Sequence, residues 1–231
     1  MPAFPPGCPP RGGNRLAAAG FGTLRGMVNV RVSLEIGPRW VFATALDWPG
    51  WCRRGRGEQA AVDTLIEYAV RYAPVAGPSF SPGEIEVVGT VPGNSITDFG
   101  APDRQGPWDD EPLDQAEADR LTGLLEAGWR YLDSVVAGAP ETLVKGPRGG
   151  GRDTSAIADH VRGAERTLSC AKAGSRVRPR TPWREQRETL AAALRAGAPG
   201  GIWPARYVIR RSAWHVLDHA WEIEDRIPGA G

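Results

Sequence analysis

The chain has 231 residues, a formal net charge of +1 and a hydrophobic fraction of 41%, which is typical of a globular protein with a substantial core. The near-zero charge argues against nucleic acid or an anionic membrane surface as a partner, and no apolar run is long enough for a membrane helix. The three cysteines, Cys8, Cys52 and Cys170, form neither a disulfide framework nor a CxxC pair. We therefore expect a cytoplasmic protein in a reducing compartment.

Residues 1–26 are rich in proline and glycine and show no hydrophobic periodicity. Such a stretch buries too little apolar surface to offset the entropy of ordering, which predicts a disordered tail. An ordered pattern begins at Met27, so we hypothesise that Met27 is the native start. The intact mass of the protein made from its own locus tests that hypothesis.

Residues 27–92 predict a small α+β module with the order β-β-α-β. Alternation of apolar and polar residues and β-rich composition indicate strands, and Gly37-Pro38 marks a hairpin turn. The expected elements are strands at 28–35, 39–46 and 85–91, a loop at 47–57 and a helix at 58–72.

The rest of the chain predicts helices. Residues 93–110 mix Gly, Pro, Asp and Asn, which indicates a linker. Helical periodicity then predicts four helices at about 114–136, 153–172, 183–195 and 205–227. Residues 111–231 are thus expected to form an up-down four-helix bundle. The predicted fold class is α+β: the small module, then an all-α bundle.

The histidines are the main functional signal. His215 and His219 are four residues apart on the last helix, so they share one face with Cβ atoms about 5–6 Å apart. Two such imidazoles can reach one metal ion, and His160 on a facing helix would supply a third nitrogen while leaving positions open, as in catalytic sites. The alternative is that these are ordinary packing histidines. HVLDH lacks the glutamate of HExxH, so a metalloprotease is not expected.

Acidic residues accompany the histidines. Glu165 and Glu222 are the candidate catalytic residues, as a general base or a fourth ligand. Carboxylates near metal-bound histidines also serve to orient them. The alternative is that the acidic residues pair with Arg210, Arg211 and Arg226 on a solvated face, which we favour for Asp225.

The loop at 145–153 leads into the helix that carries His160. Its basic residues Lys145, Arg148 and Arg152 are candidates for binding an anionic cofactor at the helix N-terminus. The loop lacks the GK[ST] of a P-loop. A lid over the mouth of the bundle and an ordinary connector are the alternatives.

Residues 111–227 resemble the DinB-like, YfiT-type four-helix family. Members carry one histidine on the second helix and a His-x-x-x-His pair on the last, and His160, His215 and His219 match these positions. The resemblance implies a divalent metal such as Zn, Ni, Fe or Mn. It also implies a thiol-dependent S-transferase or isomerase, since relatives use bacillithiol, mycothiol or glutathione. The Gly-, Ala- and Arg-rich composition is typical of high-GC coding and makes mycothiol the natural candidate.

The stretch FATALDWPGWCRRGRGEQAAVDTLIEYA is similar to HicB-like proteins. The matching positions are Asp47, Pro49, Gly50, Gly55 and Ala60. This resemblance implies a β-β-α-β fold and a role in protein interaction or ligand sensing. No helix-turn-helix or ribbon-helix-helix pattern accompanies the module, so antitoxin function is not expected.

Two functions remain as expectations. The first is a metal-dependent enzyme whose partners are a small-molecule thiol and an electrophile. The second is a non-catalytic regulatory protein that engages a partner through the HicB-like module. The chain's own Cys52 and Cys170 are not expected to be nucleophiles, because Cys170 reads as a buried small hydrophobe and Cys52 lies in the other module. A homodimer is left open.

Overall fold

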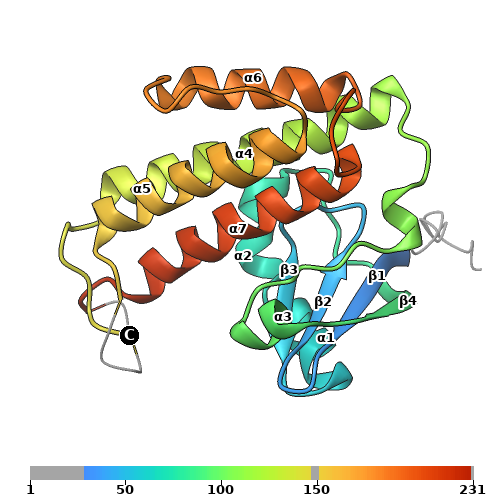
Figure 1. Cartoon of the computed structure of the whole chain (residues 1–231). Coiled ribbons are helices and arrows are strands. Elements are labelled where there is room, and N and C mark those ends of the chain that lie inside the picture. Colours follow the sequence, from blue (N-terminus) through green and yellow to red (C-terminus); the bar gives the residue numbers. More distant parts are fainter. Residues whose placement is uncertain (1–28, 147–150, 230–231) are drawn as a thin grey trace, which may run out of the picture.

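The structure is a computed structural model that describes residues 29–146 and 151–229. It has a mixed α+β fold, with a four-stranded sheet and long helices that pack beside it (Figure 1). The strands are β1 (Asn29–Ile36), β2 (Val41–Ala45), β3 (Cys52–Gly55) and β4 (Glu84–Pro92). The α-helices are α1 (Glu58–Glu67), α2 (Ala69–Ala76), α3 (Ser95–Phe99), α4 (Gln115–Gly138), α5 (Thr154–Ala164), α6 (Trp183–Arg195) and α7 (Ala205–Asp225).

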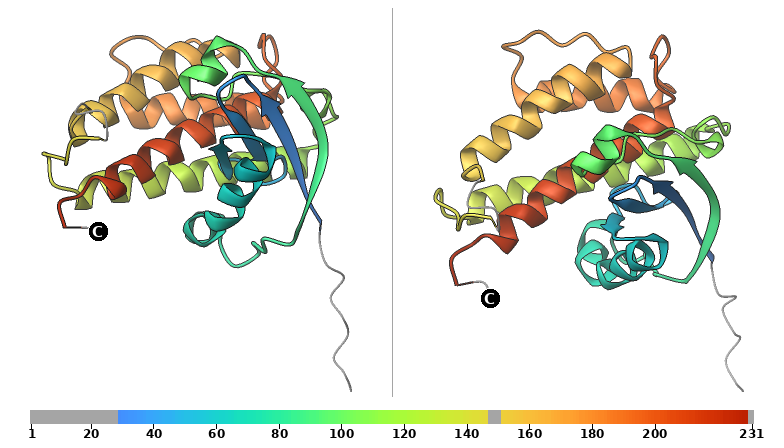
Figure 2. Two further views of the ribbon diagram at one scale, coloured as in Figure 1. Left: turned by 90° about the horizontal axis from the view of Figure 1, so that it is seen from below. Right: turned by 60° about the horizontal axis from the view of Figure 1, so that its bottom comes forward.

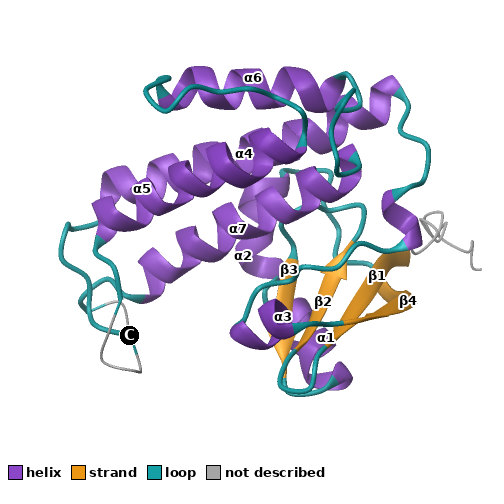
Figure 3. Ribbon diagram, viewed as in Figure 1, coloured by secondary structure: helices purple, strands orange, loops and turns teal. Residues whose placement is uncertain are grey.

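The sheet has the order β3-β2-β1-β4. Neighbours β1 and β2, and β2 and β3, run antiparallel, whereas β4 runs parallel to β1. A parallel return needs a crossover, which α1 and α2 supply between β3 and β4 (Figure 3). In β1 the residues Val30, Val32 and Leu34 alternate along the strand and are buried in the core that the helices cover.

The predicted module lacked one strand. Residues 47–57 were expected to be a loop, but Cys52–Gly55 form the edge strand β3, paired with β2 from Thr44↔Cys52 to Val41↔Gly55. The sequence CRRG has no apolar alternation, so only its pairing with β2 makes it a strand. Gly55 is required there because a Cβ would lie 2.3 Å from the backbone of Ala60 at the start of α1. The single helix expected at 58–72 is also two helices, divided at Tyr68.

The segment 93–110, expected to be a linker, carries regular structure. It contains α3 and a 3₁₀ turn, η1 (Pro107–Asp109). The buried carboxylate of Glu35 on β1 holds this segment, because it accepts hydrogen bonds from the Thr97 hydroxyl and from the backbone N–H groups of Asp103 and Arg104. Such a side-chain contact across more than sixty residues leaves no local signal in the sequence.

The four long helices lie close to where the periodicity places them. The prediction for α6 matches its bounds, and α4 and α7 begin within one residue of expectation. The helix expected at 153–172 begins as α5 but changes to a π-helical segment, η2 (Glu165–Cys170). Buried residues of all four helices meet in one core, including Leu125, Val161, Leu190 and Val216.

Helix α7 belongs to two cores at once. Its residues Val216 and Ile223 face the other long helices, whereas Leu217 and Trp221 lie in the core of the sheet with Trp51 and Leu65. The sheet and the long helices therefore share α7 as a common wall (Figure 2). Trp221 is a buried packing residue at this wall.

Among residues 29–146 and 151–229, no helix combines the length and apolarity needed to cross a membrane. The predicted disordered tail and the proposed start at Met27 lie outside the described residues.

Candidate metal centre

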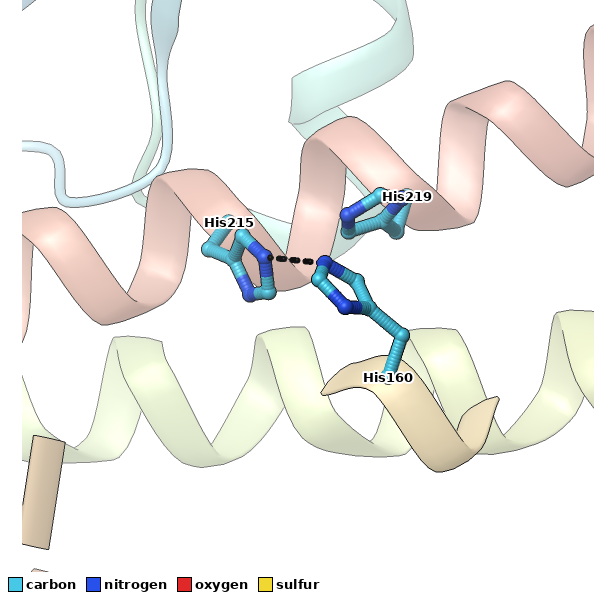
Figure 4. A group of neighbouring side chains, drawn as sticks. All are labelled: His160, His215 and His219. Carbon is cyan, nitrogen blue, oxygen red and sulfur yellow. Dashed lines mark hydrogen bonds between the residues drawn. The ribbon is translucent and has the colours of Figure 1, made fainter. Parts of the chain in front are cut away.

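His160 of α5 and the pair His215 and His219 of α7 point toward one another (Figure 4). The Nε2 atoms of His215 and His160 are 3.3 Å apart. One ring nitrogen from each histidine lies within 4.8 Å of the other two. The structure thus brings together the three residues that the sequence predicted as metal ligands.

The local sequence explains this placement. On α5, Ile157 and Val161 are buried, so His160 between them lies at the edge of the core and is only half-buried. On α7, Val216 and Ala220 occupy the core positions next to the two histidines. Because i and i+4 positions share a helix face, packing of these apolar neighbours turns both imidazoles toward α5.

The spacing suits nitrogen ligands of one ion. Two nitrogens bound tetrahedrally at about 2.0–2.1 Å from a common ion lie about 3.3–3.4 Å apart. His160 and His215 already have this separation. A set of imidazoles fits a borderline-soft divalent ion rather than Mg²⁺ or Ca²⁺, which prefer oxygen ligands.

The protonation of the histidines agrees with a ligand role. Burial lowers the pKa of His215 well below its ordinary value, and the nearby His219 and Arg211 lower it further. Burial also lowers the pKa of His160, with His219 and Arg152 adding to the effect. Neutral imidazole is the form that binds a metal, so both side chains favour the competent state near neutral pH.

Glu222 orients His219. Its Oε2 lies 2.8 Å from the Nδ1 of His219, and this hydrogen bond is the main reason that the pKa of Glu222 is lowered. An ionised carboxylate only accepts hydrogen bonds, so Nδ1 carries the proton and the Nε2 lone pair of His219 stays free for a metal. The other oxygen, Oε1, accepts from Arg226 at 2.9 Å. With both oxygens engaged, the contacts of Glu222 favour an orienting role over that of a general base.

Glu165 faces a different part of the molecule. It lies five residues after His160, about 140° around the helix, and its carboxylate accepts from Trp183 and Arg187 of α6. Burial raises the pKa of Glu165. Both α6 partners line a cavity of about 510 Å³ between α4 and α6. The hydrogen bonds of Glu165 therefore join it to α6 and not to the histidines.

The basic loop lies beside the C-terminal end of α7. The Arg226 side chain donates to the carbonyl oxygens of Val144 and Arg152, each at 2.8 Å. The charge of Arg152 also contributes to the lowering of the pKa of His160, after burial and His219. The Lys145 side chain is exposed. Arg148 lies outside the described residues.

The alternative reading of the sequence grouped Arg210, Arg211 and Arg226 as partners of the acidic residues near the histidines. For Arg226 this is confirmed, because it pairs with Glu222 at 2.9 Å. Arg210 instead pairs with the buried Asp109 of η1 at 2.7 Å, and Arg226 links Glu222 to the basic loop. Arg211 lies four residues before His215, so helical spacing could have placed it on the same helix face as the histidines.

Comparison with known proteins found no match: no protein-family model, no curated protein and no solved structure is similar to this chain. Function must therefore be inferred from the histidines and the side chains around them.

Proposed function

We propose that the protein is a divalent-metal-dependent enzyme of the DinB-like kind that uses a low-molecular-weight thiol in an S-transfer or isomerisation. One observation carries the proposal. All three histidines of the chain converge, although His160 and His215 are 55 residues apart in sequence. Chance placement of three such rare residues at one point between two helices is a poor alternative.

In this proposal His160, His215 and His219 hold the ion. A divalent ion with three protein ligands and an open position supplies Lewis acidity and lowers the pKa of a bound thiol, so that a thiolate forms near neutral pH. Glu222 fixes the ring of His219 through Nδ1. The half-buried position of all three rings limits access of water to the site.

The nucleophilic thiol has to come from a cosubstrate. Cys52 and Cys170 are buried, and burial raises the pKa of each to about 12. Such thiols are protonated and inaccessible at neutral pH, and so they are not nucleophiles. A cytoplasmic thiol such as mycothiol, which the family resemblance implies, would take this role. Cys8 lies outside the described residues.

The alternative is a regulatory protein that binds a partner through the HicB-like module. The observation in its favour is the edge strand β4, where Val87 and Val88 are exposed. Phe99 of α3 is exposed at 87% of its surface. Exposed apolar residues at an open sheet edge are typical of strand-addition interfaces.

The first experiment measures the metal content of the purified, untagged protein by mass spectrometry. We expect about one equivalent of Zn, Ni, Fe or Mn in the wild type and its loss in His160→Ala. The matched control is Asp159→Asn, because Asp159 is the exposed neighbour of His160 on α5, and it should keep the metal. If the wild type contains no metal and takes none up on titration, the proposal is wrong, and partner capture with the β4 edge intact becomes the next test.

A further inference from the structure

Arg211 lies on the histidine face of α7. It precedes His215 by four residues, as His215 precedes His219, so the three side chains follow one face at successive turns. Because Cβ atoms at i and i+4 of a helix lie about 5–6 Å apart, the Arg211 side chain starts one turn away from that of His215.

The neighbouring arginines at α7 all have a carboxylate partner. Arg206 pairs with Glu117, Arg210 with Asp109 and Arg226 with Glu222. Arg211 differs from them. Its Nε is buried without a hydrogen-bond partner, and no hydrogen bond or ion pair joins its guanidinium to another residue within 29–146 and 151–229.

Arg211 is nevertheless held in place. Its Cζ lies 4.6 Å from the ring centre of Trp214, within the range of a cation–π contact. Trp214 is buried and packs edge-to-face on Phe42 of β2, with ring centres 6.1 Å apart. Trp214 also lies 6.0 Å from His215. A wall built from α7 and the sheet therefore positions the cation beside the histidines.

The acidic groups in its surroundings are already engaged. Glu35 and Asp103 act electrostatically on Arg211. The carboxylate of Glu35 accepts from Thr97 and from backbone N–H groups, and that of Asp103 accepts from Asn94 at 3.0 Å. Burial lowers the pKa of Arg211, but a guanidinium stays charged in proteins. A half-buried cation without an anion costs free energy, which a bound anion would offset.

We propose that Arg211 binds the carboxylate of a small ligand whose other end occupies the three-histidine centre. The planar fork of a guanidinium matches a carboxylate in two parallel hydrogen bonds. The inference rests on the proposed function and names a substrate class for it: either the thiol or the electrophile carries a carboxylate. Arg211 is then a specificity residue for that group.

The test uses full-length protein loaded with Co²⁺, whose visible bands report ligand binding without any turnover. The probes for the thiol are mercaptoacetate and 2-mercaptoethanol, which differ in the carboxylate. The probe for the electrophile is crotonate, added after saturation with 2-mercaptoethanol. If the thiol carries the carboxylate, we expect the wild type to bind mercaptoacetate about 10- to 100-fold more tightly than 2-mercaptoethanol, as for a charge-assisted hydrogen bond. If the electrophile carries it, we expect the wild type to bind crotonate and the affinity to fall by a similar factor when Arg211 is replaced.

The variants separate recognition from folding. Arg211→Gln should bind one equivalent of Co²⁺ and lose the carboxylate preference, and Arg211→Lys should keep only part of it because lysine lacks the fork. Arg206→Gln is the control, since Arg206 pairs with Glu117 away from the histidine face. If Arg211→Gln does not fold, Arg211→Lys and the control still give the comparison.

The outcomes distinguish the two proposals. A wild type that binds Co²⁺ but shows no carboxylate preference in either arm overturns the inference about Arg211 and leaves the metal centre intact. A preference that Arg211→Gln retains overturns it as well. A wild type without Co²⁺ bands overturns both.

Discussion

Glu222 joins the histidine cluster to the end of α7, since one of its carboxylate oxygens lies 2.8 Å from the Nδ1 of His219 and the other accepts from Arg226. Arg226 in turn donates hydrogen bonds to the backbone carbonyl oxygens of Val144, just before the basic loop, and of Arg152 within it. The orientation of the His219 ring thus depends on contacts that extend across the C-terminal end of the helix. The relationship makes Glu222 a positioning residue with a measurable effect.

Replacement of Glu222 by alanine should weaken metal binding roughly 10- to 100-fold, the usual effect of losing a partner that orients a ligand. The reason is that His219 would lose the acceptor that holds its Nε2 free. Competition with a chromophoric chelator measures the affinity. Asp225→Ala is the control because Asp225 pairs with Arg71, and it should bind metal like the wild type. If the two variants bind the metal with equal affinity, Glu222 does not orient a metal ligand.

The metal-free protein should lose stability as the pH falls below about 6.5, the ordinary histidine value. The pKa values of His160 and His215 are lowered in the folded state, so in this range the unfolded chain binds protons that the folded chain does not. Each such histidine adds up to about 1.4 kcal/mol of destabilisation per pH unit until its folded pKa is reached. Urea unfolding of chelator-treated protein at pH 7 and 5.5 measures the change.

The comparison with His215→Gln isolates this effect, because carboxylates such as Glu222 and Glu165 contribute equally to both proteins. The variant should show a flatter dependence on pH between 7 and 5.5. Parallel pH profiles would mean that His215 is as readily protonated in the folded state as in the unfolded chain.

Glu165→Ala should reduce stability and leave the metal in place. Glu165 is 2% exposed and accepts from Trp183 and Arg187. Loss of the Glu165 carboxylate leaves the buried Arg187 with Asp133 as its one remaining carboxylate partner among the described residues. We expect this to lower the free energy of unfolding by about 3 kcal/mol. Glu188→Ala is the control, because its exposed pair with Arg184 should be worth less than about 1 kcal/mol. Loss of metal without loss of stability in Glu165→Ala would instead place Glu165 at the metal centre.

Gly50→Ala should weaken the contact between the sheet and α7. Gly50 has φ +97°, and a Cβ there would lie 2.6 Å from the Cδ1 of Leu217. Gly57 has nearly the same φ, +100°, but nothing lies within 4 Å of its Cβ position. Gly57→Ala therefore reports backbone strain of about 1–3 kcal/mol alone, and Gly50→Ala should add about 1–3 kcal/mol of overpacking. If urea unfolding shows the same loss of stability for both variants, then α7 shifts to accommodate the added methyl group at no further cost.

Local periodicity alone determined much of the helical part of this protein. The apolar spacing located α4, α6 and α7, and the i,i+4 spacing put His215 and His219 on one face, because helix geometry depends only on residues near one another in sequence. The same rule places the candidate Glu222 three residues after His219, and it could also have pointed to Arg211. The expected packing role of Cys170 is confirmed, since its side chain is buried.

Tertiary structure decided the rest. The strand β3 exists because β2 offers it hydrogen bonds, and the segment 93–110 is ordered by the distant carboxylate of Glu35. Glu165 turned out to face α6, while Arg211 is the arginine of α7 that no described carboxylate neutralises. Each of these outcomes depends on contacts between residues far apart in the sequence, and local sequence patterns do not specify such contacts. The sequence by itself therefore identified the three candidate ligands, and only the packing of α5 against α7 brought His160 to within 3.3 Å of His215.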